Sequence, residues 1–159
     1  TLERLNRLQG ASSGEYAQDV ANDIRASMQL HAGVFRTQAS MDEGVKKIAE
    51  LRNRVNSVGL KDHSKVFNTA RIEALEVENL IEAAQATMVS AAARKECRGA
   101  HTVSDYERPA DDPVAPLGRD DANWMKHTLW HSESNSLTYK PVKLKPLTVD
   151  SVPPKVRTF

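Results

Sequence analysis

The sequence is poor in the residue patterns that hold metals, phosphates and membranes. Its single cysteine, Cys97, excludes an internal disulfide, a CxxC pair and a thiolate cluster for zinc or iron and sulfur. The glycines never form a GxGxxG or P-loop pattern, so no cofactor is expected to bind within this chain. Charges interrupt the apolar stretches, so nothing approaches the roughly 20 apolar residues of a membrane span, and no direct membrane insertion is expected.

The chain also lacks an excess of either charge. Lysine and arginine total 22 against 21 aspartate and glutamate, a formal net charge of +1, so no overall field favours nucleic acid or an anionic membrane as partner. A length of 159 residues fits one domain with a tail. The first residue is Thr1, and no signal-peptide pattern follows it, so we expect a piece excised from a longer protein.

Apolar residues recur at helical spacing through most of the first hundred residues. Ser40 precedes Glu43 by three positions, a capping-box spacing that predicts a helix start. Gly59 and Gly99 are predicted to end helices. The pattern predicts a short helix followed by three longer amphipathic ones, over residues 1–9, 15–33, about 41–56 and about 66–98.

The longest of these segments carries a seam for two neighbouring helices. Its apolar positions alternate in steps of four and three, and many are alanine, which lets backbones approach closely. Arg94, Lys95 and Arg98 are expected to face the negative end of this helix. We therefore predict a mainly α fold: a three-helix bundle, similar to a spectrin repeat, over residues 1–101.

Residues 102–159 have a different composition. Prolines and aspartates predict an irregular excursion after His101. Runs rich in Thr, Leu, Tyr, Trp and Val at residues 126–131 and 137–142 predict a β-hairpin. From Lys143 onward we expect an extended tail, and the whole of 102–159 is expected to pack on the bundle as part of a single domain.

The densest polar cluster runs from Arg94 to His101. Arginine pairs with carboxylates through two hydrogen bonds, so Arg94 and Arg98 with His101 form a candidate site for a dicarboxylate or for an acidic protein surface. Positive residues in a last helical turn also cap the helix, and that alternative stays open.

Other candidates carry weaker signals. His127 and His131 have zinc-like spacing only if their segment is helical, and no HExxH accompanies them, so no metal site is expected. Cys97 near two arginines is either an activated thiolate or a buried inert thiol, and the second is favoured. Trp124 and Trp130 are interpreted as core or interface aromatics.

Several short motifs, taken in order, carry a resemblance to a known family. The chain resembles the C-terminal region of flavoprotein subunits of the succinate dehydrogenase and fumarate reductase family, and its Lys-His-Thr-Leu segment and Pro-Pro ending favour the succinate dehydrogenase branch. The residues that carry it are Met28-Gln29, Val34-Phe35-Arg36, Phe67-Asn68-Thr69, Glu76-Val77-Glu78-Asn79-Leu80, Arg94-Lys95-Glu96, Arg98-Gly99-Ala100-His101, Arg119-Asp120-Asp121, Asn123-Trp124, Lys126-His127-Thr128-Leu129 and Val152-Pro153-Pro154-Lys155-Val156-Arg157-Thr158-Phe159.

This resemblance implies a parent enzyme that oxidises succinate to fumarate on covalently attached FAD and passes electrons through an iron-sulfur subunit to quinone. In the family the FAD-binding and catalytic residues lie upstream, so none is assigned here, and this chain alone is expected to be inactive. The implied partners are the FAD-binding domain of the same subunit and the iron-sulfur subunit. The implied location is peripheral, on the cytoplasmic face of a bacterial inner membrane or the matrix side in mitochondria.

The contact with these partners is expected at the turn from Arg94 to His101, with Arg98 as ion-pair donor and His101 as a capping or interface hydrogen-bonding group. Cys97 stands where relatives commonly have serine, which weakens any catalytic reading of that position. Two other classes remain as alternatives: a free-standing helical adaptor, and a small hydrolase or dicarboxylate-binding enzyme built around Arg98 and His101.

Overall fold

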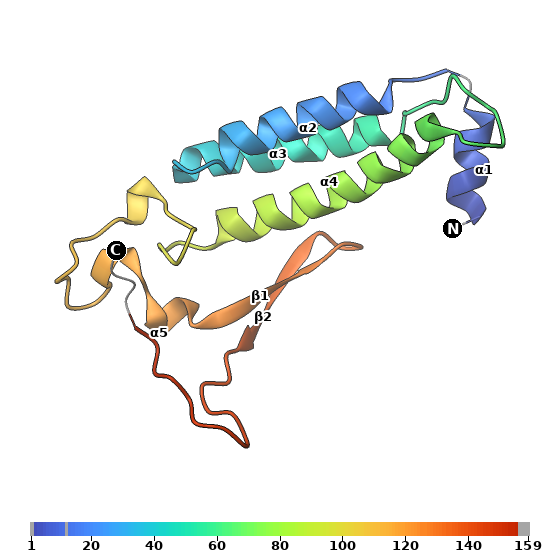
Figure 1. Cartoon of the computed structure of the whole chain (residues 1–159). Coiled ribbons are helices and arrows are strands. Elements are labelled where there is room, and N and C mark those ends of the chain that lie inside the picture. Colours follow the sequence, from blue (N-terminus) through green and yellow to red (C-terminus); the bar gives the residue numbers. More distant parts are fainter. Residues whose placement is uncertain (1, 12, 156–159) are drawn as a thin grey trace.

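The computed structural model describes residues 2–11 and 13–155, so Thr1 of the first expected helix and residues 156–159 of the expected tail lie outside the described residues. Figure 1 shows a bundle of long helices with a hairpin and an irregular C-terminal region along one side. The elements in order are α1 (Leu2–Gly10), α2 (Ala17–His31), α3 (Gln38–Val55), α4 (Thr69–Ala93), the 3₁₀ turns η1 (Ser104–Tyr106) and η2 (Pro116–Gly118), α5 (Asp121–Trp124), β1 (Lys126–His131) and β2 (Ser136–Pro141).

Helices α2, α3 and α4 pack lengthwise on one another, which confirms the predicted mainly α fold and its three-helix bundle (Figure 1). Their apolar stripes meet in a continuous core. The short helix α1 lies across one end of the bundle and inserts Leu8 into the same core. The residues buried there include Val20, Ile24, Ile48, Leu51, Val55, Val77, Ile81 and Met88.

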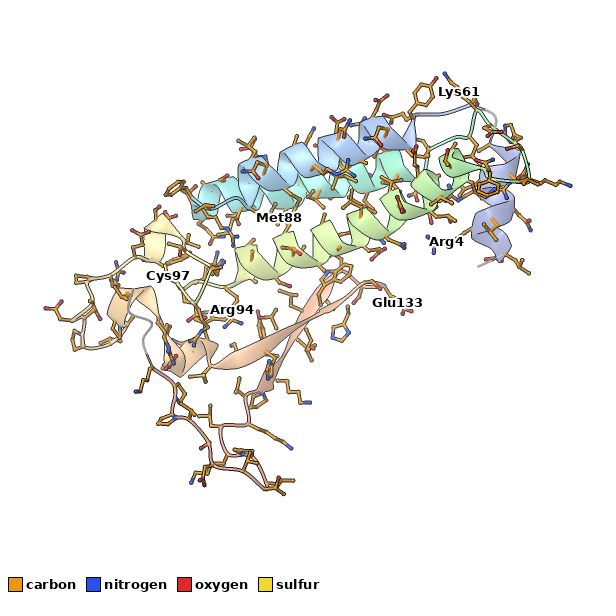
Figure 2. The ribbon with its side chains drawn as sticks, viewed as in Figure 1. Arg4, Lys61, Met88, Arg94, Cys97 and Glu133 are labelled. Atoms are coloured by element: carbon orange, nitrogen blue, oxygen red, sulfur yellow. The ribbon has the colours of Figure 1, made fainter. Side chains whose placement is uncertain are left out.

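The helices approach closely where Gly44 of α3 faces both neighbours. A Cβ atom built on Gly44 would lie 2.6 Å from Cβ of His31 on α2 and 2.7 Å from Cε of Met88 on α4. Met88, labelled in Figure 2, is fully buried between the helices. A side chain at position 44 would therefore push the helices apart.

Two predicted helix ends are wrong by several residues. Helix α3 is capped by Thr37, whose hydroxyl oxygen accepts a hydrogen bond from the backbone N–H of Ser40 at 3.1 Å, so the cap is not the predicted pair of Ser40 and Glu43. Helix α4 ends at Ala93, because Arg94 has an extended backbone. Gly99 has the predicted left-handed conformation, with φ of +58°, but it lies in a separate turn.

The predicted hairpin is present, with a shift of one residue in its second strand. Strands β1 and β2 pair antiparallel, from Lys126 opposite Pro141 to His131 opposite Ser136, and β1 lies against α4. The described part of the chain after Pro141 contains no helix or strand, as expected for an extended tail. In the part of the chain that the structure describes, no helix is both long and apolar enough to cross a bilayer.

Candidate functional site

The cluster predicted from the sequence forms at the C-terminal end of α4, but its centre is a residue that had been given no role. The carboxylate of Glu96 is completely buried. It accepts hydrogen bonds from Nη2 of Arg94 at 2.7 Å, from Nε and Nη2 of Arg98 at 2.9 Å each, and from the backbone N–H of Asp120 at 3.1 Å. Burial of a charge is costly unless it is paired and hydrogen-bonded, and Glu96 satisfies both conditions.

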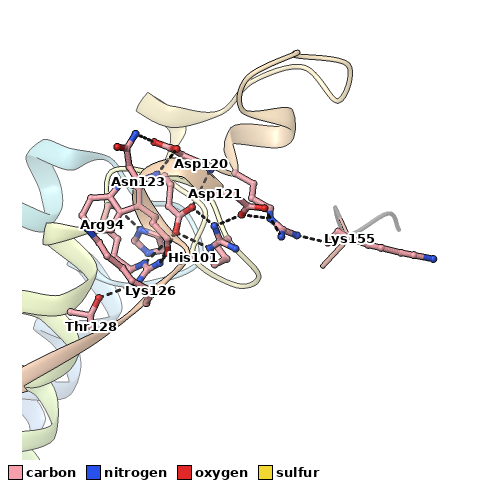
Figure 3. Close-up of polar contacts among 12 residues, drawn as sticks. Arg94, His101, Asp120, Asp121, Asn123, Lys126, Thr128 and Lys155 are labelled. Carbon is pink, nitrogen blue, oxygen red and sulfur yellow. Dashed lines mark hydrogen bonds and ion pairs between the residues drawn. The ribbon is translucent and has the colours of Figure 1, made fainter. Parts of the chain in front are cut away.

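Arg94 joins the helix end to the hairpin. Besides Glu96, its guanidinium donates to the carbonyl of Trp124 at 2.6 Å, to the carbonyl of Lys126 at 3.1 Å and to the hydroxyl of Thr128 at 3.0 Å (Figure 3). One side chain therefore holds α4, α5 and β1 together. The planar guanidinium suits this task, because it presents five N–H donors in fixed directions.

Arg98 extends the same network toward the C-terminal tail. Its Nη2 lies 2.6 Å from Oδ1 of Asp121, which also accepts from Nε of Arg119 at 2.7 Å. Arg119 in turn donates to the carbonyl of Lys155, as the dashed lines in Figure 3 show. The hydrogen bonds that Arg98 donates to Glu96 raise the pKa of Arg98, and the hydrogen bonds that Asp121 accepts from Arg119 lower the pKa of Asp121.

This pairing bears on the dicarboxylate alternative. Arg94 and Arg98 already hold a carboxylate in the two-point geometry that they would offer to a ligand, and the carboxylate belongs to Glu96 of the same chain. A succinate molecule at this place would have to displace a fully buried side chain. The arrangement is therefore that of an internal structural ion pair, which argues against a substrate site here.

His101 lies between Arg94 and a residue from the α2–α3 connection. Its Nε2 lies 3.1 Å from the carbonyl oxygen of Arg94, and its Nδ1 lies 3.0 Å from Nη1 of Arg36. Since arginine can only donate, Nδ1 must accept and Nε2 must carry the proton. Burial, and then the charge of Arg36, lower the pKa of His101, so the imidazole is neutral at pH 7.

Arg36 therefore belongs to the site, although its sequence position gave no signal of this. Its Nε donates to the carbonyl of Gly33 at 2.7 Å, and its own carbonyl accepts from the backbone N–H of Ser104 at 2.9 Å. These bonds fix the loop between α2 and α3 against the segment that contains His101. The loop itself exposes Val34 and Phe35, with 73% and 92% of their surface accessible.

Cys97 is a buried thiol rather than an activated nucleophile. Its Sγ lies 3.4 Å from both the backbone N and the carbonyl oxygen of Val103. Burial raises the pKa of the thiol, opposite to the shift that thiolate chemistry requires. The two arginines nearby are engaged with Glu96, so they do not offset that effect.

The remaining candidates lie in the hairpin and at the end of α5 just before it. His127 and His131 lie on a strand, where residues four apart are too distant to share one ion, and His131 contacts the hydroxyl of Thr138 at 2.8 Å. The described residues contain no group of three metal-ligating side chains. Trp124 packs edge-on against Tyr139, and Trp130 donates to Asn135 in the hairpin turn.

The fold and this network define a helical domain in which the clustered arginines are paired with carboxylates of the same chain. Residues 21–159 match the sequence family described as "Fumarate reductase flavoprotein C-term". The chain belongs to this family, as the C-terminal domain of a flavoprotein of the succinate dehydrogenase and fumarate reductase group.

The individual relatives agree. The chain is 39% identical over 156 residues to the succinate dehydrogenase flavoprotein subunit of Coxiella burnetii, covering 98% of this chain and 25% of the relative. It is 37% identical to the mitochondrial succinate dehydrogenase flavoprotein subunit of Oryza sativa, covering all of this chain and 24% of that protein. A solved E. coli quinol fumarate reductase superposes with a TM-score of 0.76 at 30% identity, over 96% of this chain and 25% of that one. The chain thus spans about a quarter of the length of these relatives.

Proposed function

We propose that this chain is the C-terminal structural domain of a succinate dehydrogenase flavoprotein that oxidises succinate to fumarate. The observation that carries the proposal is the family match over residues 21–159 in a chain that spans about a quarter of its flavoprotein relatives. In this proposal the remaining three quarters hold FAD and the catalytic residues, and electrons leave through an iron-sulfur subunit to quinone. The subunit lies peripherally, on the cytoplasmic face of a bacterial inner membrane or the matrix side in mitochondria.

No residue of this chain is assigned to FAD. Arg94 and Arg98 are paired with Glu96, and Asp121 takes a further bond from Arg98. The domain acts instead by packing against the FAD-binding part of the subunit. The turn that contains Arg94, Arg98 and His101 supports this role, because it holds the end of α4, the hairpin and the exposed Val34–Phe35 loop in one fixed arrangement.

The substitution Arg98→Ala in the full-length subunit tests this structural role. The change removes the two-point pair with Glu96 and the bond to Asp121, so we expect lower flavin content and weaker assembly with the iron-sulfur subunit. Arg108→Ala is the matched control, because Arg108 is exposed and, among the described residues, its side chain donates only to the neighbouring carbonyl of Glu107. Flavin absorbance and size-exclusion chromatography measure the result. Unchanged flavin content, assembly and succinate oxidation in Arg98→Ala would remove this role.

The competing function is a free-standing helical adaptor. A coding sequence for a FAD-binding region in the same reading frame, upstream of Thr1, excludes the adaptor. A transcript and start codon that produce this chain alone favour it. Calorimetry with succinate and fumarate distinguishes the structural domain and the adaptor from the dicarboxylate-binding alternative. Only the dicarboxylate-binding alternative predicts binding heat, and it predicts that Arg98→Ala abolishes this heat.

A further inference from the structure

The end of the bundle opposite to the Glu96 network exposes two large apolar side chains. Val66 and Phe67 have 74% and 98% of their surface accessible. Phe67 also has a positive φ of +49°, a left-handed backbone conformation that is unfavourable for a bulky side chain. The described chain offers this aromatic ring almost no apolar contact in return.

The loop that carries Phe67 is nevertheless held by several hydrogen bonds of the next residue, Asn68. Asn68, which is buried, donates from Nδ2 to the carbonyls of Asp62 at 2.7 Å and Ser64 at 2.9 Å. Its Oδ1 accepts from the backbone N–H of Arg71 at 2.8 Å, which caps the start of α4. These bonds close the loop onto the helix and hold the backbone on either side of Phe67. An exposed aromatic side chain on a well-held backbone is typical of an anchor that fills a pocket on a partner.

The neighbours of this loop indicate which partner it meets. Helix α1 lies beside it in Figure 1, with Gln9 hydrogen-bonded to the carbonyl of His63 and to the guanidinium of Arg71. Residues 1–20 precede the segment that matches the C-terminal family, and they align with the relatives together with the rest of the chain. The part of these flavoproteins that leads into the C-terminal domain is therefore anchored at the same end as Phe67.

We propose that Val66 and Phe67 form the apolar anchor by which this domain docks onto the preceding, FAD-binding part of the same polypeptide. The inference rests on the proposed function and deepens it, because it names the contact surface and its partner. The partner surface is an apolar pocket continuous with the contact that α1 already makes. The left-handed backbone at Phe67 is the local cost of aiming the ring into that pocket.

The experiment measures thiol protection in the full-length flavoprotein. Phe67→Cys and Phe35→Cys are made separately, labelled with a maleimide in the native protein and in denaturant, and quantified at each site by mass spectrometry. Position 67 is expected to label about tenfold or more slowly in the native subunit than after unfolding. Equal labelling in both states overturns the inference. Hydroxyl-radical oxidation of Phe67 in the unmodified subunit gives the same readout without a substitution.

The remaining outcomes separate the inference from the proposed function. Protection at position 35 with none at position 67 shows that the domain docks through its other end, so the proposed function stands and the inference fails. Protection at neither position overturns the inference, while the proposed function is still decided by the Arg98→Ala test. Protection at position 67 that appears only after the iron-sulfur subunit is added, or only at high protein concentration, assigns the surface to another subunit or a second copy and also overturns the inference.

Discussion

Nδ1 of His101 and Nη1 of Arg36 lie 3.0 Å apart, although 65 positions separate the two residues in the sequence. The contact requires a neutral imidazole, since a protonated His101 would direct an N–H toward a guanidinium that has no acceptor. The connection between α2 and α3 is therefore attached to the segment after α4 by a bond that depends on protonation.

The first prediction concerns pH. The pKa of His101 lies below its ordinary value of 6.5 in the folded chain, mainly because the side chain is buried. Below about pH 6.5 His101 takes up a proton in the unfolded chain but not yet in the folded chain. The free energy of unfolding should therefore decrease as the pH is lowered, until His101 is protonated in the folded chain as well. Thermal unfolding of the 159-residue chain between pH 7.5 and 5 measures this. His101→Gln should flatten the profile, and exposed His63→Gln should not. Superimposable profiles for wild type and His101→Gln would contradict the assignment.

The second prediction concerns Glu96. Replacement by glutamine leaves Arg94 and Arg98 without their shared counter-charge around a completely buried side chain. We expect a loss of roughly 3–5 kcal/mol in the free energy of unfolding, as found when one partner of a buried ion pair is removed. Urea denaturation measures it, with Glu133→Gln in the exposed hairpin turn as control. If both variants unfold at the same urea concentration, Glu96 does not hold the network together.

The third prediction concerns the helix crossing at Gly44. Alanine at this position would place Cβ 2.6 Å from His31 and 2.7 Å from Met88. Overpacking costs about 1–3 kcal/mol, and the better helix propensity of alanine recovers ~1 kcal/mol, so we expect a net loss of up to about 2 kcal/mol. Gly10→Ala is the control, because nothing lies within 4 Å of its added Cβ. A more stable Gly44→Ala would show that the helices can separate without cost.

The fourth prediction distinguishes two candidate helix caps. Thr37→Ala removes the hydroxyl that accepts from the N–H of Ser40, and should cost about 1 kcal/mol. Ser40→Ala removes only a contact of 3.3 Å with His31 and should cost less. Circular dichroism during denaturation compares the two variants. The reverse order would restore the capping box that the sequence pattern suggested.

Periodicity predicted the bundle well because its signal is repeated over many turns, and the hairpin was equally visible in its β-branched and aromatic residues. Arg94, Arg98 and His101 lie in one hydrogen-bonded turn, and their role as a domain interface stays a prediction. The sequence pattern missed Glu96 as the centre because a helix was expected to continue through residue 98. In a helix, residues two apart point in different directions, whereas outside it Arg94, Glu96 and Arg98 can meet. Arg36 was missed because no local pattern indicates a contact so distant in sequence.

The single thiol of the chain, Cys97, can report when the junction between the end of α4 and the irregular segment after it opens. Cys97 is 7% exposed, lies where the helix end meets the irregular segment, and is held by Val103. A thiol reagent can reach it only when that junction opens, and the chain contains no other cysteine to compete for the reagent. The rate of modification under native conditions therefore reports every opening that exposes this region, local or global, and comparison with exchange of the amide protons of α3 and α4 separates the local openings from unfolding of the bundle.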